Sequence, residues 1–198
     1  MFAKKACLIV ISVLALTAAI PAQTFKIDPG HSSVSFSIRH FVSKVKGRFT
    51  DFSGTINYDS TKIENSSVSA VIQTASLNTD NENRDKHLKS PDFFEVDKYP
   101  GITFQSKKVE KKDGKYILTG TFKMHGVEKE ISFPFDFLGL SVSPEGTARS
   151  GFEAEFAIDR KDYGITYNRA LDQGGFLLGD EVKVSIAIEA IYRKPETK

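Results

Sequence analysis

Phenylalanine alternates with polar or small residues along several stretches of the chain, and this pattern limits the fold more than any other feature. The clearest stretches are residues 34–38, 131–137 and 152–158. Successive side chains of a β-strand point to opposite faces, so a period of two is typical of strands with one buried and one wet face. The chain has 16 phenylalanines and no tryptophan. The buried faces are therefore strongly aromatic, and they either fill a large all-β core or line an apolar cavity.

The first 22 residues are predicted to be a secretory signal peptide. Lys4 and Lys5 precede an apolar run over residues 6–20, and small residues follow the run. This order is typical of a cleavable signal, and the run is shorter than the roughly 20 residues that a transmembrane helix needs. We place cleavage after Ala22, with Ala19 as the alternative. We therefore expect residues 23–198 to form one periplasmic or secreted domain without stable membrane insertion.

Charge and cysteine content exclude further classes of protein. The only cysteine, Cys7, lies in the predicted signal peptide, so disulfides are not expected to stabilise the mature chain. The chain has 27 basic and 25 acidic residues, and two of the basic ones, Lys4 and Lys5, also lie in that segment. A neutral mature chain lacks the basic surface of a nucleic-acid-binding protein, so we expect no nucleic-acid partner.

The rest of the chain is rich in predicted strands, which cover residues 25–28, 33–41, 45–59, 67–77, 101–111, 115–124, 127–138, 147–159 and 181–193. Turn sequences such as Asp113-Gly114 and His125-Gly126 join neighbouring strands. Residues 80–99 lose the alternation and predict a short helical insert that Pro91 interrupts and Pro100 ends. Long strands with short connections favour an antiparallel up-and-down arrangement, and alternation alone leaves open a closed barrel or a two-sheet sandwich.

A series of short motifs gives a more specific indication. In chain order they are IDPGHS (27–32), VSFSIRH (34–40), GRF (47–49), FSG (52–54), RDKHLKS (84–90), DFFEV (92–96), YPGITF (99–104), MHGV (124–127), DRKDYG (159–164) and GDEV (179–182). This series resembles the YceI-like family of secreted, lipocalin-like polyisoprenoid-binding proteins, and the resemblance covers nearly all of the mature chain. One departure is Phe25, where many relatives are expected to carry tryptophan.

The resemblance implies an all-β, lipocalin-like fold, namely an extended antiparallel barrel of eight strands with the short helical insert at about 80–99. It also implies a long hydrophobic tunnel for a polyprenyl chain or a similar lipid, such as a quinone or a fatty acyl compound. No cofactor other than this bound lipid is expected, and the family makes a homodimer plausible.

If the barrel is hollow, alternation selects the side chains that line it. The candidate ligand-binding residues on strands are Phe36, Ile38, His40, Phe52, Ile72, Phe104, Leu118, Phe122, Phe133, Phe135, Phe152 and Phe156. Burial of a lipid tail releases about 0.8 kcal/mol per CH₂ group, so binding needs no dedicated polar anchor. Ordinary core packing is the alternative for many of these residues.

Two irregular segments are candidates for the rim of the tunnel. Leu88 and Phe93 lie in the insert, and Arg160 and Phe176 flank a long loop before the last strand. The insert is either a lid that closes on the tail or a plug stabilised by an Arg84–Asp85 pair.

The four histidines, His31, His40, His87 and His125, have no short metal-ligand spacing and no cysteine partner. We therefore expect structural hydrogen bonds and no metal site, while His40 shares the inward face with Phe36 and Ile38 and could bond a ligand head group.

The resemblance, together with the apolar candidate lining, favours a lipid carrier or sequestering protein that has no catalytic residue. Two alternatives stay open: an isomerase or hydrolase that acts on a lipid in the barrel with His40 as general base, and a heme or metal carrier. No nucleophile–base signature supports the enzyme.

Overall fold

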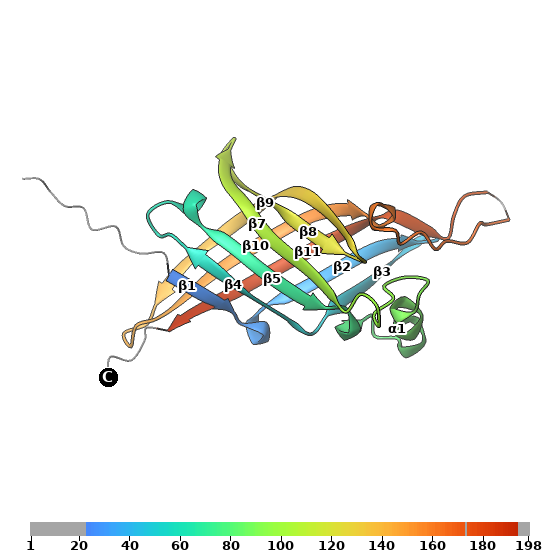
Figure 1. Ribbon diagram of the computed structural model, residues 1–198, viewed down its shortest axis with the longest axis horizontal. Coiled ribbons are helices and arrows are strands. Elements are labelled where there is room, and N and C mark those ends of the chain that lie inside the picture. The colour runs from blue at the N-terminus through green and yellow to red at the C-terminus, as the bar shows by residue number, and fades with distance from the viewer. Residues whose placement is uncertain (1–22, 173, 194–198) are drawn as a thin grey trace, which may run out of the picture.

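Eleven β-strands of one antiparallel sheet make up most of the computed structural model, which describes residues 23–172 and 174–193 (Figure 1). The predicted signal peptide lies outside the described residues. The strands are β1 (Gln23–Ile27), β2 (Ser33–His40), β3 (Ser43–Phe49), β4 (Phe52–Tyr58), β5 (Ser67–Gln73), β6 (Leu77–Asn78), β7 (Gly101–Lys112), β8 (Lys115–Met124), β9 (Val127–Val142), β10 (Thr147–Asp159) and β11 (Leu178–Arg193).

The sheet closes into a barrel of eight strands. Their order is β1-β4-β5-β7-β8-β9-β10-β11, and β1 also pairs with β11, which completes the circuit. The long β11 pairs with β1 near its C-terminal end and with β2 along its first half, and β3 and β6 extend the sheet from β2. The predicted eight-stranded antiparallel barrel is confirmed, and the two-sheet alternative is wrong.

Short interruptions bend the first strands of the barrel. The 3₁₀ turn η1 (Pro29–His31) separates β1 from β2, and η3 (Thr74–Ser76) separates β5 from β6. Asp28 caps η1, because its carboxylate accepts a hydrogen bond from the Gly30 amide at 3.0 Å. Residues 45–59 and 67–77 were each expected to be one strand, but the structure divides both. The breaks at residues 50–51 and at η3 lie side by side, joined by hydrogen bonds from the Gln73 amide to Asp51 O and from the Thr50 amide to Ser76 O, so neighbouring strands are interrupted at the same place.

Strand register explains the alternating sequence. In the β10–β11 pair, Phe152 lies opposite Ile188 and Phe156 opposite Val184, and all four belong to the inner face. Glu155 between the two phenylalanines is exposed. Paired residues share a face of the sheet, so the phenylalanines of neighbouring strands gather inside the barrel.

The predicted helical insert is present, although only α1 (Glu82–Lys89) is helical and turns form the rest of it. The Asn81 side chain caps α1 by accepting a hydrogen bond from the Arg84 amide at 2.9 Å. The insert lies at one end of the barrel (Figure 1), where Phe93 is buried in the core and Leu88 packs against it. Two other 3₁₀ turns, η2 (Ile63–Asn65) and η4 (Arg160–Tyr163), follow β4 and β10. No helix within the described ranges has the length and apolar character to cross a membrane.

Candidate functional site

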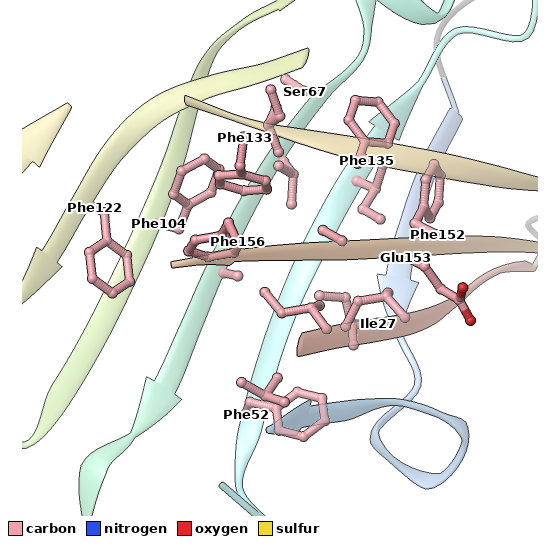
Figure 2. A pocket seen from close by; sticks show the side chains of 18 of the residues that line it. Ile27, Phe52, Ser67, Phe104, Phe122, Phe133, Phe135, Phe152, Glu153 and Phe156 are labelled. Atoms are coloured by element: carbon pink, nitrogen blue, oxygen red, sulfur yellow. The ribbon is translucent and has the colours of Figure 1, made fainter. Parts of the chain in front are cut away.

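An apolar cavity of about 170 Å³ lies inside the barrel, and we call it the inner cavity. Figure 2 shows phenylalanine side chains that line it from β7, β9 and β10. Aliphatic residues such as Val68 and Ile186 complete the wall. A cavity of about 150 Å³ with this kind of lining stays dry and can hold a benzene molecule. The inner cavity therefore has room for a ring-sized apolar group.

The walls of the inner cavity are packed aromatic rings. The rings of Phe133 and Phe156 stack with centroids 4.2 Å apart, and Phe104 lies 5.6 Å from Phe133. Gly120 makes room for this layer, because a Cβ atom there would lie 2.5 Å from Cζ of Phe104. The carboxylate of Glu153 points away from the rings (Figure 2). The interior of this cavity thus offers apolar contacts to a ligand.

An aromatic cluster lies at the end of the barrel away from α1. Phe25 is 0% exposed, and its ring lies 5.8 Å from Tyr58 and 5.7 Å from Tyr192. Tyr58 also stacks on Phe137 at 5.5 Å. Burial raises the pKa of the Tyr58 hydroxyl, so this group stays neutral. The cluster is therefore packed core beside the inner cavity.

A second cavity, of about 330 Å³, lies at the α1 end, and we call it the outer cavity. Strand β2 contributes Phe36, Ile38 and His40, the insert contributes Leu88 and Phe93, and the loop after η4 contributes further residues. Val34 and Ile72 line both cavities. The two cavities therefore follow one another through the barrel, with these two side chains between them.

Three aromatic rings join the insert to the loop over the outer cavity. The ring of Tyr167 lies 5.1 Å from His87 and 5.0 Å from Phe93, and His87 lies 5.1 Å from Phe93. Nε2 of His87 also contacts the Asp92 carboxylate at 2.9 Å, which fixes the orientation of its ring. Insert and loop together form a roof, so a ligand in the outer cavity would touch irregular segments as well as strands.

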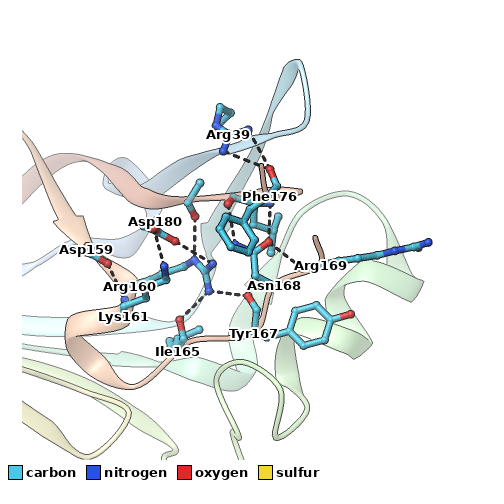
Figure 3. A network of polar contacts seen from close by, with 12 residues as sticks. Arg39, Asp159, Arg160, Lys161, Ile165, Tyr167, Asn168, Arg169, Phe176 and Asp180 are labelled. Atoms are coloured by element: carbon cyan, nitrogen blue, oxygen red, sulfur yellow. Dashed lines mark hydrogen bonds and ion pairs between the residues drawn. The ribbon is translucent and has the colours of Figure 1, made fainter. Parts of the chain in front are cut away.

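Arg160 holds the loop in place (Figure 3). Its side chain is buried, and Nη1 donates to the carbonyl oxygens of Ile165 and Tyr167 at 2.7 and 2.8 Å. Nε donates to Gly179 O at 2.9 Å, and Nη2 reaches Asp180 at 3.3 Å. These contacts use four of the five guanidinium donors. Arg160 lines the outer cavity, at the rim where it was expected. Its nitrogen atoms, however, donate to groups of the protein and so hold the loop.

Arg84, another arginine of the outer cavity, lies on α1 and ties the insert to Thr79, which follows β6. Arg84 donates from Nε to Thr79 Oγ1 at 2.8 Å and from Nη2 to Thr79 O at 2.8 Å. Asp85 accepts hydrogen bonds from the amide and the hydroxyl of the same threonine. The suggested direct Arg84–Asp85 pair is wrong, because the buried Thr79 lies between the two side chains and bonds to both.

The structure places nearly all predicted site residues at one of the two cavities. The inner cavity is lined by Phe52, Ile72, Phe104, Leu118, Phe122, Phe133, Phe135, Phe152 and Phe156. The outer cavity is lined by Phe36, Ile38, His40, Ile72, Leu88, Phe93 and Arg160. Phe176 lines neither cavity and is 55% exposed. Its loop has no strand register, so alternation could not fix the direction of its side chain.

Sequence reasoning missed several residues of the outer cavity, namely Val45, Phe49, Phe94, Met124, Ile165, Tyr167, Arg169 and Leu177. The alternation could have identified Phe49. It is the last residue of β3, before the break that separates β3 from β4, so its side chain keeps the inward direction set by β3. Tyr167 and Arg169 lie in an irregular loop, where no periodic signal exists.

Three of the four histidines have hydrogen-bond partners. Nδ1 of His31 contacts Asp28 at 2.9 Å, Nδ1 of His125 donates to Tyr163 O at 2.9 Å, and His87 contacts Asp92 as described. His40 lines the outer cavity, and its imidazole has no hydrogen-bond partner among residues 23–172 and 174–193. It is therefore free to bond a ligand group.

Asp28, His31 and Glu189 also gather closely enough to hold a cation, with one ligand atom from each within 4.8 Å of the others. Arg149 pairs with Glu189 and lies 3.8 Å from the Asp28 carboxylate. The guanidinium already supplies the positive charge at this cluster, so the arrangement is that of an ion-pair network.

Comparison with known proteins agrees with this architecture. The YceI-like domain model matches residues 25–190. A UPF0312 protein of Staphylococcus aureus (strain N315) is 38% identical over 167 residues, which cover 83% of this chain and 95% of that protein. The crystal structure of a Campylobacter jejuni YceI protein is 34% identical with a TM-score of 0.69, over 79% of this chain and 91% of that one. A polyisoprenoid binding domain from Saccharophagus degradans shares the fold at 17% identity, with a TM-score of 0.65 over 87% and 99% of the two chains.

Proposed function

This chain belongs to the YceI-like family, and from that premise we propose that it binds the hydrocarbon tail of an isoprenoid or related lipid inside its barrel and carries or sequesters it. The observation that carries the proposal is the inner cavity, an apolar space inside the barrel with phenylalanine walls. The solved Saccharophagus degradans domain is described as polyisoprenoid binding, and this supports the choice of ligand class.

The two cavities suggest how such a lipid would lie. The outer cavity lies at the α1 end and the inner cavity follows it, so a tail that enters at the α1 end would reach the inner cavity last. The more polar part of the ligand would stay in the outer cavity, near His40, Arg84 and Arg169. Because the inner cavity has room only for a ring-sized apolar group, a long tail requires the side chains between the two cavities to move aside.

We propose carriage without catalysis. The free imidazole at the site, His40, has no carboxylate partner in the described part of the chain that would orient it as a general base. Arg160 already uses its donors within the protein. We also propose that the protein uses no cofactor other than its lipid, and that it works in the periplasm or outside the cell, where a tail that water rejects needs a shield.

A chain-length series tests this function. Polyprenols of increasing length should bind with a Kd that falls with each added isoprene unit, because each CH₂ group contributes up to about 0.8 kcal/mol. The Kd should level off once both cavities are full. Phe135→Arg, which puts a cation at the inner wall, should weaken binding of the longer polyprenols about a hundredfold, the equivalent of roughly four CH₂ groups.

Asp136→Arg is the matched control, since this position is next to Phe135 on the outer face of β9. It should leave binding within a factor of two or so of the unmodified protein. Two results would contradict the proposal: affinity that does not depend on chain length, or a Phe135→Arg protein whose loss of binding merely follows an equal loss of folded protein.

A further inference from the structure

Two apolar loop tips stand exposed at the α1 end of the barrel. Phe41 and Val42 form the tight turn between β2 and β3, and they are 50% and 92% exposed. Phe176, in the loop before β11, is 55% exposed. We call these three residues the apolar tip. Exposed apolar side chains that cluster on a monomer mark a surface for a partner or a membrane.

The turn at Phe41 departs from the turn chemistry used elsewhere in the chain. Three two-residue turns begin with a left-handed residue: Phe41 with a φ of 55°, Asp113 with 50° and His125 with 51°. Glycine follows Asp113 and His125, as such turns favour, whereas the bulky Val42 follows Phe41. Phenylalanine is also a poor residue for the left-handed region. The strain lies at Phe41, because Val42 is not among the residues with positive φ, and glycine at position 41 would relieve it. Strain of this kind is found at functional positions.

Hydrogen bonds hold the two tips side by side. The Phe41 amide donates to Leu177 O at 2.7 Å, and Nη1 of Arg39 donates to Phe41 O at 3.1 Å and to Phe176 O at 3.4 Å (Figure 3). The apolar tip is therefore one surface built from two segments, and both of its parts can meet the same partner.

Several basic residues lie near the apolar tip. Arg39 bridges its two halves, Lys44 follows the turn, Arg169 belongs to the loop, and Nζ of Lys161 lies 5.9 Å from the Phe176 ring. Asp172 is an acidic residue of the same loop, and Asp180 is occupied by Lys161 at 2.8 Å. Apolar side chains beside basic residues are typical of surfaces that enter the interface of an anionic membrane.

The apolar tip also lies at the rim of the outer cavity. His40 and Leu177, the direct neighbours of Phe41 and Phe176, line that cavity. We propose that the apolar tip inserts into the surface of an anionic phospholipid bilayer and so brings the α1 end of the barrel onto the membrane. This docking goes beyond the proposed lipid binding, because a barrel without ligand would dock as well.

A tryptophan reporter tests the docking locally. The chain has no tryptophan, so Val42→Trp introduces one without background. Its emission should shift to the blue, and brominated lipids should quench it, with vesicles of phosphatidylcholine mixed with phosphatidylglycerol. Phosphatidylcholine alone should produce a much smaller change.

Leu138→Trp is the matched control, because Leu138 is 61% exposed near the other end of β11. Equal shifts for both reporters, or none for Val42→Trp, would overturn the proposal.

A second variant removes the apolar surface while it improves the turn. Phe41→Gly combined with Val42→Asn should lower the vesicle partition coefficient about tenfold or more, with an unchanged or higher Tm, because glycine suits the left-handed position 41. Leu138→Ser should leave partition unchanged. Residues 1–22 are common to all variants, so the contrast between them measures the tip alone.

Unaltered partition would overturn the proposal. A dimer in analytical ultracentrifugation that is lost in the double variant alone would also overturn it, since the partner of the apolar tip would then be a second copy of the chain. Phe135→Arg should still dock, which separates this test from that of lipid binding.

Discussion

The inner and the outer cavity are both apolar, but they are built in different ways. Strand residues supply most of the inner wall, and stacked rings such as Phe133 and Phe156 hold its shape. The roof of the outer cavity comes from the insert and from the loop after η4, joined by contacts such as that of His87 with Tyr167. The strand-built cavity suits a uniform hydrocarbon tail, whereas the loop-built cavity, with its arginines and a free imidazole, suits the polar end of a ligand and its entry.

This difference makes the two cavities unequal in stability. Strands of a closed barrel open only with the whole fold, whereas segments held by a few side chains open locally at lower free energy. The outer roof depends on Arg160 and on three ring contacts. We therefore expect substitutions at the outer cavity to act on the roof, and substitutions at the inner cavity to act on the capacity for a tail.

Arg160→Ala should have the largest effect on stability. It removes a buried cation and leaves the carbonyl groups of Gly179, Ile165 and Tyr167 without their donor. Removing one partner of such a buried network costs about 3–5 kcal/mol. Urea denaturation followed by circular dichroism measures this loss. Arg169→Ala, at an exposed position in the same loop, should change the free energy of unfolding by less than about 0.5 kcal/mol. Similar values for the two variants would show that Arg160 does not hold the roof.

Ala154→Leu should change stability and binding in opposite directions. Ala154 lines the inner cavity between the rings of Phe152 and Phe156, so a larger side chain there fills empty space. Filling a cavity typically raises the free energy of unfolding by about 0.5–2 kcal/mol, and the lost room should weaken polyprenol binding about tenfold. Ala157→Leu, on the outer face of the same strand, should do neither. Clear destabilisation by Ala154→Leu would mean that the inner space is already packed.

The smallest effect on stability is expected from a fall in pH that protonates Asp180. The hydrogen bond from Lys161, together with the charges of Lys161, Arg160 and Arg39, lowers the pKa of Asp180 below its usual 3.8. A carboxylate with a lowered folded pKa stabilises the fold above about pH 4, and this contribution disappears as the pH falls through the folded pKa. Asp180→Asn should therefore be less stable than the unmodified protein at pH 7, and the difference should vanish in acid. Thermal melts across this range measure it, and a difference that persists in acid would contradict the ion pair.

The contrast between the cavities also explains what the sequence could predict. Alternation placed Phe104, Phe133 and Phe156 correctly on the inner face, because a strand of fixed register allows two directions only. It could not show that a space remains between them, since the same pattern would serve a filled core. That space depends on the exact packing of rings around positions such as Gly120 and Ala154.

Irregular segments were harder to predict. Arg160 was expected at the rim and lies there, but its role in holding backbone carbonyls depends on a loop path that the sequence does not reveal. Tyr167 was missed, and Phe176 points to the surface instead of into a cavity. In such segments the direction of each side chain is set by long-range contacts, as with the bonds from Arg39 to the Phe41 and Phe176 carbonyls.

The most direct test of the central claim is to identify what the protein carries. The protein should be purified from its own host without detergent, extracted with organic solvent and analysed by mass spectrometry, with Phe135→Arg purified in parallel. We predict a compound with a long isoprenoid or fatty tail, recovered in near-stoichiometric amount from the unmodified protein and strongly depleted from the variant. Extracts with no apolar compound, or with equal amounts from both proteins, would contradict the account of the barrel as a lipid-binding tunnel.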